Sequence, residues 1–347
     1  MFFGGQTMKK IKELDVLSGM AIIMVILIHA DRFYVRSILN LNSYLDAGVA
    51  VNILDNLIWA SVPIFIFISG YKYYQNNICT NKNYFFFIKK QLIKILPLFL
   101  FVSLFYISIE FLNLAFTQNQ PLESVLIHSS KRFLNIFLGY NIAYQLWYIP
   151  LYFFVIILYP LVYKKVSNDL NRFIVLTFVS IAVIYLGLLS YPIKFFYYLI
   201  FFDLGVQFNK HQLHKKINLL SISCIAIAII SICTINKDPH INIFLKHLIL
   251  NPIMVIFYWK ISFFLSNSFV LQLLGKYSFY IFLFHEPIIV KGISQIIDKT
   301  LSYNSFIYVF VVAITSIVIT IYFAKIYLFF SNKISETFLV KNKVKRF

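Results

Sequence analysis

Two histidines with acidic neighbours are the residues of this chain best suited to proton-transfer chemistry. His29 is followed by Asp31 and Arg32 at the end of an apolar stretch, and His285 is followed directly by Glu286 in another. A neutral imidazole can take the proton from a hydroxyl that attacks an acyl donor. A nearby carboxylate fixes the tautomer of such a histidine and stabilises the imidazolium. These residue types predict a general base at His29, with Asp31 as the second catalytic residue.

A structural interpretation of the same residues stays open. His29 can be a helix-end histidine wetted by a membrane interface, and the His285–Glu286 pair can be a polar helix end. The depth of His29 favours function. At ~1.5 Å rise per residue, His29 lies ~21 Å along a helix from Asp15. A histidine that deep in a bilayer is costly unless it faces a bundle interior or a water-filled cavity.

The elements that carry these residues are apolar enough to span a membrane. The chain has 347 residues, of which 60% are hydrophobic and 13% charged, with a mean hydropathy of +0.80. Runs of about 18–25 apolar residues are typical of transmembrane helices, because lipid cannot satisfy backbone donors and acceptors. We therefore expect an all-α, polytopic integral membrane bundle of about ten transmembrane helices. The candidate spans are roughly 15–35, 54–75, 91–115, 144–163, 171–190, 194–209, 217–235, 246–265, 272–294 and 304–330.

The distribution of charge predicts the orientation. Most of the 31 Lys and Arg residues fall in segments on one side of the membrane, so the positive-inside rule puts both termini in the cytoplasm and His29 towards the outer face. The net charge of +18 is then explained by topology and anionic lipid, and nucleic-acid binding is not expected. The chain divides into a leader over 1–14, a membrane domain over 15–330 and a basic cytoplasmic tail over 331–347.

Two further groups of residues suit particular ligands. Lys90 and Lys94 enter the third span, where they can contact the phosphates of a nucleotide-bearing donor; plain positive-inside anchoring is the alternative. Trp147 and Tyr148 open the fourth span and can form a stacking platform for a sugar ring. Interfacial aromatics belong at that height in any case, so a purely structural role also stays open.

Several polar residues inside the apolar runs have structural interpretations. Gly19 lets another helix or a ligand approach closely, while the adjacent Ser18 can hydrogen-bond to its own helix. Glu110 and Asp203 are intramembrane carboxylates, which usually pair with cations in a bundle, and we favour a structural or channel-lining role for both. The segment 116–143 predicts an interfacial amphipathic helix from its spacing of apolar residues.

Five motifs in a fixed order resemble acyltransferase family 3 of polytopic membrane proteins. The motifs are LDVLSGMAIIMVILIH in the first span, PIFIFISGYKYY in the second, FFFIKKQLIKILP into the third, QLWYIPLYFFVIILYP in the fourth and LGKYSFYIFLFHEPII in the ninth. They cover about 15–160 and 272–290. Each motif alone is weak, and the ordered set is fairly specific.

This resemblance implies a function and one catalytic residue, and it completes the list of expected ligands and partners. It implies a ten-helix acyltransferase of the bacterial cytoplasmic membrane, which takes an acyl group, expected to be acetyl, from acyl-CoA as co-substrate. The acceptor is a hydroxyl of a cell-surface polysaccharide or its precursor, and no metal or tightly bound cofactor is implied. The family's essential first-helix histidine maps onto His29. The expected partners are the bilayer, the glycan and the glycan synthase machinery. The expected substrate-binding residues are Asp15, Ser18, Arg32, Lys90, Lys94, Trp147, Tyr148, His285 and Glu286.

The chain departs from the family pattern at positions where the family's arginines could bind the acyl donor. Ser18 stands where the family usually has an arginine, and the paired arginines that enter the third span fall on Gln91 and Lys94. Both changes remove bidentate guanidinium groups. These departures, together with the pore-compatible carboxylates Glu110 and Asp203, make an exporter or transporter of a glycan or lipid-linked sugar the alternative function. A structural partner of a polysaccharide synthase is a third.

Overall fold

The computed structural model of the protein describes residues 11–33, 48–75, 84–118, 120–135, 145–188, 193–236, 238–300 and 307–344. Within these ranges the chain is helical and contains no strand, which is the all-α class expected. In chain order the elements are α1 (Lys12–Phe33), α2 (Val49–Ile58), α3 (Ser61–Gln75), α4 (Tyr84–Leu112), η2 (Asn113–Thr117), α5 (Leu122–Asn135), α6 (Tyr148–Lys165), α7 (Asp169–Tyr185), η4 (Ile193–Tyr198), α8 (Leu199–Lys210), η5 (Leu213–Lys215), α9 (Leu219–Ile235), α10 (Pro239–Phe244), η6 (Leu245–Leu250), α11 (Asn251–Phe264), α12 (Phe269–Phe284), η7 (His285–Ile289), α13 (Val290–Thr300) and α14 (Ile307–Val344).

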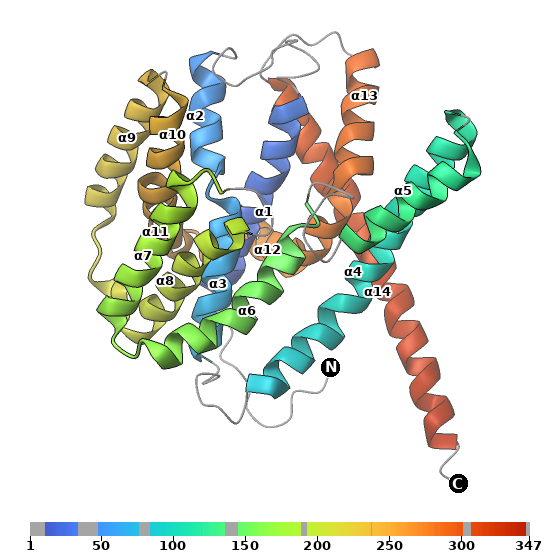
Figure 1. Ribbon diagram of the computed structural model, residues 1–347, viewed down its shortest axis with the longest axis horizontal. Helices are drawn as coiled ribbons and strands as arrows, with labels where there is room; N and C mark the ends of the chain where they lie inside the picture. Colours follow the sequence, from blue (N-terminus) through green and yellow to red (C-terminus); the bar gives the residue numbers. More distant parts are fainter. Residues whose placement is uncertain are drawn as a thin grey trace.

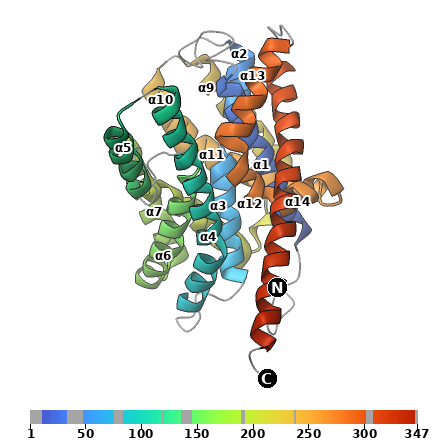
Figure 2. The same ribbon diagram turned by 90° about the vertical axis from the view of Figure 1, so that its right-hand side faces the viewer.

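Helix α1 lies at the centre of the bundle. It packs against α2, α3, α11, α12, α13 and α14, and most of its side chains between Leu14 and Ala30 are buried. Figure 1 shows the helices of the main body gathered around it, while α4, α5 and one half of α14 extend to the side. The view in Figure 2 separates these last elements, since α4 and α5 stand on one side of the body and α14 runs along another.

Glycines explain how closely α1 approaches α12. A Cβ added at Gly19 would lie 2.1 Å from the carbonyl oxygen of Leu271, and one added at Gly275 would lie 1.8 Å from that of Asp15. Small residues at a crossing let two backbones pack directly, which is a common way for helices to associate in lipid. The close approach predicted at Gly19 is confirmed. It sets the helix that carries His29 against the helix that leads to His285.

A second crossing of the same kind joins α3 to α8. Gly70 faces the carbonyl of Phe202, and Gly205 faces the carbonyl of Phe67. The ring of Phe67 also packs edge to face on Phe208, with centroids 5.4 Å apart. Two glycine crossings, of α1 with α12 and of α3 with α8, therefore hold the main body together.

Six helical stretches in the described ranges are long and apolar enough to cross a membrane. They are Lys12–Asp31, Val49–Gln75, Tyr84–Thr117, Tyr148–Lys165, His240–Phe264 and Ile307–Phe329. Leu219–Ile235 and Phe269–Phe284 are apolar but shorter. These stretches agree with a multi-pass membrane protein, while the count of ten spans and the side of the termini stay predictions.

Three boundaries differ from those expected. The second predicted span consists of two helices, because a turn at Trp59 and Ala60 separates α2 from α3. The ninth is interrupted by the π-helical segment η7, which contains a proline. Helix α14 continues into the predicted tail as far as Val344, since the sequence after Phe330 has no Gly or Pro to end it.

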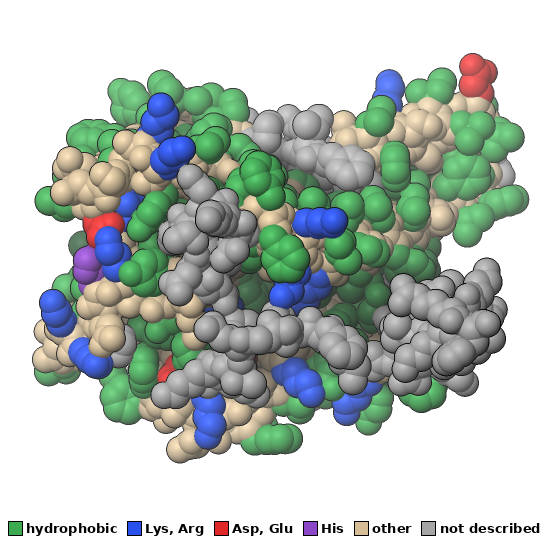
Figure 3. Space-filling model, turned by 90° about the horizontal axis from the view of Figure 1, so that it is seen from below, with side chains coloured by type: hydrophobic (Ala, Val, Ile, Leu, Met, Phe, Trp, Pro, Cys, Tyr) green, Lys and Arg blue, Asp and Glu red, His purple; other side chains and the backbone are tan. Residues whose placement is uncertain are grey.

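Basic side chains are spread over the end of the molecule where α1 begins and α14 ends. Figure 3 looks at this end and shows many Lys and Arg side chains with few acidic ones between them.

The predicted amphipathic segment also forms a helix, α5, which turns back along α4. Both features agree with the charge and apolar patterns of the sequence.

Candidate active site

The two histidines singled out in the sequence meet in the interior of the bundle. The ring centroids of His29 and His285 are 4.9 Å apart in an edge-to-face arrangement. The Nδ1 atom of His29 lies 3.8 Å from Oε1 of Glu286. His285 is fully buried, and the side chains of His29 and Glu286 are only 13% and 14% exposed. Two imidazoles and a carboxylate therefore share one site that is largely excluded from water.

This geometry is suited to general-base chemistry at His29. A carboxylate near Nδ1 favours the tautomer that carries its proton there, which makes Nε2 the basic atom. The separation of 3.8 Å is longer than a hydrogen bond. Glu286 therefore acts on His29 as a nearby charge, and its attraction grows when the imidazole takes up a proton.

A break in the helix positions His285 and Glu286. The proline that follows Glu286 has no N–H for the carbonyl of Leu283, and it restricts the residue before it, so Glu286 is extended at φ −120° and ψ 152°. The hydroxyl of Tyr106 donates to the carbonyl of Leu283 at 3.4 Å and to that of Glu286. The side-chain amide of Gln145 donates to the same Glu286 carbonyl. Side chains from outside α12 thus stabilise the break.

The other predicted catalytic residue lies close by in the sequence but on another side of the helix. Asp31 is fully buried, and residues two apart on a helix do not face each other. The carboxylate beside His29 in the structure is that of Glu286. The side chain of Arg32 lies outside the described residues, and the roles of Asp31 and Arg32 stay predictions.

The residues predicted to hold the donor lie near the other end of α1. The hydroxyl of Ser18 donates to a carbonyl of its own helix at 2.8 Å, as the structural interpretation expected. The charges of Asp15 and Lys94 both act on Lys72 of α3, so α1, α3 and α4 bring these three side chains to one end. Lys90 is one turn from Lys94 on α4 and is half-buried. This group is separate from the histidine site.

The aromatic residues predicted to stack on a sugar have different surroundings. The ammonium of Lys194 lies over the ring of Trp147, 4.1 Å from its centroid. The ring of Tyr148 lies 5.1 Å from that of Phe282, which in turn is 6.0 Å from the ring of His285. Tyr148 is therefore linked to the histidine site, while one face of Trp147 is covered by a cation. Their sugar-binding role stays a prediction.

One of the two intramembrane carboxylates is paired with the amphipathic helix. Glu110 of α4 accepts a hydrogen bond from Arg132 of α5 at 2.9 Å, and His128 lies 3.2 Å from it. The side chains of Arg132 and Glu110 are 32% and 27% exposed. This pair ties the hairpin of α4 and α5 together.

The other carboxylate, Asp203 of α8, lies in a buried polar network. Arg172 of α7 donates to it at 2.5 Å, and both side chains are 0% exposed. Tyr159 and Gln207 donate to its two oxygens at 2.7 and 2.5 Å. Arg172 also donates to Asp169 at 2.8 Å. The network joins α6, α7 and α8, and the predicted pairing of both carboxylates with cations is confirmed.

Asp169 extends this network to the end of α7. It accepts hydrogen bonds from Lys210 at 2.6 Å and from Arg172, and His211 lies 2.8 Å away. Burial alone would raise the pKa of Asp169, but its bonds with Lys210, Arg172 and His211 hold that pKa well below its usual range. The same contact with Asp169 raises the pKa of Lys210.

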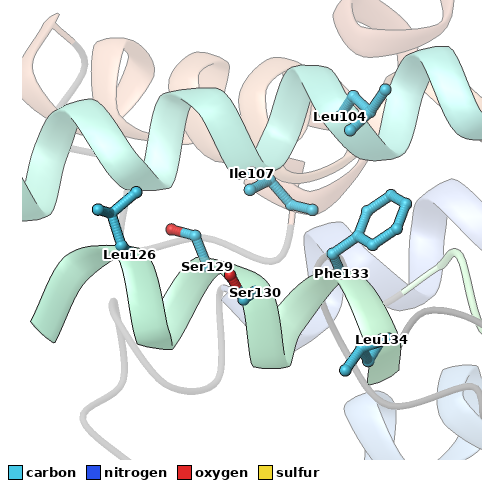
Figure 4. A pocket seen from close by; sticks show the side chains of 7 residues that line it. All are labelled: Leu104, Ile107, Leu126, Ser129, Ser130, Phe133 and Leu134. Atoms are coloured by element: carbon cyan, nitrogen blue, oxygen red, sulfur yellow. The ribbon is translucent and has the colours of Figure 1, made fainter. Parts of the chain in front are cut away.

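A shallow apolar cavity of about 410 Å³, open to the surface, lies between α4 and α5. Figure 4 shows its lining side chains, which are Leu104, Ile107, Leu126, Ser129, Ser130, Phe133 and Leu134. None of them is titratable, so the cavity offers no acid–base chemistry. Among the described residues, no three His, Cys, Asp or Glu side chains are grouped as metal ligands.

The sequence analysis missed Tyr106 and Gln145 as parts of the site. Gln145 stands in a quoted motif without a role, and Tyr106 is one aromatic residue among many in its span. The signal was the proline after Glu286, because a proline inside a helical run leaves a carbonyl that needs a donor from elsewhere. It could not indicate which side chain supplies that donor.

Comparison with protein families decides which family the chain belongs to. The family model described as an acyltransferase domain, that of acyltransferase family 3, matches residues 11–325. The chain belongs to acyltransferase family 3. Neither the curated proteins nor the solved structures give a match. The range that matches acyltransferase family 3 includes α1, which carries His29, and the segment α12–η7, which carries His285 and Glu286.

Proposed function

We propose that this protein is an O-acyltransferase of the bacterial cytoplasmic membrane, which transfers an acetyl group from acetyl-CoA to a hydroxyl of a cell-surface polysaccharide or its precursor. The observation that carries the proposal is the buried group of His29, His285 and Glu286 inside an acyltransferase family 3 chain. A membrane interior keeps such groups only where they are paired or functional.

His29 acts as the general base in this reaction. The acceptor oxygen attacks the thioester carbonyl while its proton passes to Nε2 of His29, and Glu286 stabilises the imidazolium. A carbon–oxygen bond forms, the carbon–sulfur bond breaks, and the imidazolium returns the proton to the leaving thiolate. The histidine is therefore neutral again after each turnover.

The donor enters from the end of the molecule that carries the lysines. Lys90, Lys94 and the adjacent Lys72 supply positive charge there, and Lys is a common ligand of phosphate. That end is ~20 Å from His29 by the rise of α1, so the donor lies extended, with its phosphates at the lysines and its thioester at the histidines. The bilayer, acyl-CoA and the glycan, with its synthase machinery, are the partners of this reaction.

The transport alternative receives no support from the intramembrane carboxylates that suggested it. Glu110 is paired with Arg132, and Asp203 is paired with Arg172. Carboxylates held in such pairs are explained by the packing of helices and need no pore.

Transfer of labelled acetyl from acetyl-CoA to hexose and hexosamine oligosaccharides tests the proposal, with purified protein in detergent. His29→Ala should lower the rate by about 10²–10⁴, the usual contribution of a general base. His128→Ala is the control, because His128 is exposed on α5. Wild-type protein that transfers nothing contradicts the function, and His29→Ala at the wild-type rate contradicts the base. Deletion that leaves glycan acetylation unchanged while glycan accumulates inside the cell indicates an exporter.

A further inference from the structure

Two buried hydrogen-bond acceptors at the helix break have no partner in the described part of the chain. They are Nε2 of His285 and Oε1 of Gln145, on side chains that are 0% and 2% exposed. A buried acceptor without a donor costs about 1–3 kcal/mol. Two such atoms at one break call for a ligand that brings its own donors.

The remaining atoms of these side chains establish that both are acceptors. Nδ1 of His285 lies 2.8 Å from the carbonyl oxygen of Phe282 and 3.1 Å from that of Ile281. Since carbonyls only accept, Nδ1 carries the proton and Nε2 has the lone pair. The amide nitrogen of Gln145 donates to the Glu286 carbonyl, so its oxygen is the unpartnered atom.

The nearby hydroxyl of Tyr106 is already used as a donor and does not satisfy either acceptor. The hydroxyl of Tyr106 donates to the carbonyls of Leu283 and Glu286. A carboxylate, that of Glu286, also lies at the break, 3.8 Å from His29. The acceptor atoms and this carboxylate together disfavour an anion and favour a neutral or cationic molecule rich in hydrogen-bond donors.

We propose that Nε2 of His285 and Oε1 of Gln145 form a subsite that receives hydrogen bonds from the hydroxyl groups of the sugar acceptor. The subsite takes neutral and amino sugars in preference to uronic acids. It holds the attacking hydroxyl beside His29, whose ring centroid is 4.9 Å from that of His285. This inference rests on the proposed function and adds the class of its acceptor.

A pair of substitutions separates the two nitrogen atoms of His285. His285→Asn keeps a donor at the δ position for the backbone carbonyls and loses the ε acceptor, whereas His285→Gln keeps an acceptor at the ε position. We expect His285→Asn to fold, to lower kcat/KM for a glucosamine oligosaccharide about tenfold and to leave KM for acetyl-CoA unchanged. Tenfold corresponds to about 1.4 kcal/mol, one hydrogen bond. His285→Gln should retain more activity than His285→Asn.

The control is a half-buried histidine outside the site. His247 packs between the rings of Trp59 and Tyr197, so His247→Asn should leave KM for the oligosaccharide unchanged. If His285→Asn resembles the wild type while His285→Gln lowers the thermal unfolding midpoint, His285 only stabilises the break and the inference is wrong.

Calorimetric binding of two oligosaccharides needs no variant and separates this inference from the proposed function. The wild-type protein should bind a glucosamine oligosaccharide more tightly than one of glucuronic acid. Binding of the glucosamine oligosaccharide without acetyl transfer contradicts the proposed function and supports the subsite. Equal or tighter binding of the glucuronic acid oligosaccharide overturns the subsite, even if transfer is observed.

Discussion

Alanine at position 275 adds one methyl group where α1 crosses α12. The added Cβ would lie 1.8 Å from the carbonyl oxygen of Asp15 and 2.7 Å from its carbonyl carbon. A carbon–oxygen contact needs about 3.3 Å, so the two backbones must separate there by about 1.5 Å. Both atoms that block the methyl group belong to the backbone, so no side chain can turn away to make room.

The expected loss has one part in stability and one in activity. Alanine is the better helix former by about 1 kcal/mol, but overpacking costs about 1–3 kcal/mol and more when a backbone must move. We expect Gly275→Ala to lower the free energy of unfolding by about 2 kcal/mol. Because α1 carries His29 and α12 leads to His285, the shift also separates the two imidazoles. A displacement of about 1 Å can lower a rate about 10²-fold.

The measurement is the thermal unfolding midpoint of the detergent-solubilised protein, taken together with acetyl transfer. Gly292→Ala is the matched control, since Gly292 lies in helix α13 and an added Cβ would have no atom within 4 Å. That control should be unchanged or up to about 1 kcal/mol more stable. If Gly275→Ala is as stable and as active as Gly292→Ala, the close crossing of α1 and α12 is refuted.

The polar networks give two further predictions. Asp203→Asn removes one of the two carboxylates that the buried guanidinium of Arg172 contacts and leaves Asp169 as the other. It should cost about 3 kcal/mol of unfolding free energy, the lower end for a broken buried pair. Glu110→Gln breaks a partly exposed pair and should cost about 0–1 kcal/mol; equal unfolding midpoints for the two variants would contradict this. Because the folded-state pKa of Asp169 is depressed, its stabilising effect is fully present above the unfolded pKa of about 3.9 and is lost as pH falls below it. The difference in unfolding midpoint between wild type and Asp169→Asn should therefore still be present at pH 5 and shrink below pH 4. A difference that increases below pH 4 would contradict this prediction.

The fold class could be predicted from the sequence because lipid cannot satisfy backbone hydrogen-bond donors and acceptors. Runs of apolar residues must form helices, and Gly19 indicated a close crossing before its partner at Leu271 was known. The helix boundaries were harder to predict. Pro63 has no N–H for the carbonyl of Trp59, but such a proline does not by itself show whether a helix kinks or ends. The length of α14 depends on the absence of a residue that ends a helix, and such an absence is weaker evidence than the presence of one.

The site was predicted in its residue types but not in its pairing. His29, His285 and Glu286 were each selected because ionisable groups are costly in apolar runs. Asp31 was chosen as the carboxylate partner because it is close in sequence, whereas the structure has Glu286 beside His29. Contacts between α1 and η7 join residues more than 250 positions apart, and no local pattern encodes them.

The two halves of α1 have different tasks, and this explains the departure at Ser18. In its first half, Gly19 faces the backbone of α12 and the carbonyl of Asp15 faces Gly275, while the hydroxyl of Ser18 bonds to its own helix. These atoms are occupied by packing, so little of this half remains to bind a donor. The lysines of α3 and α4 at the same end are more accessible, since Lys72 and Lys94 are exposed. Positive charge supplied by α3 and α4, in place of an arginine on α1, is therefore compatible with acyl-CoA as the donor. The second half of α1 carries His29.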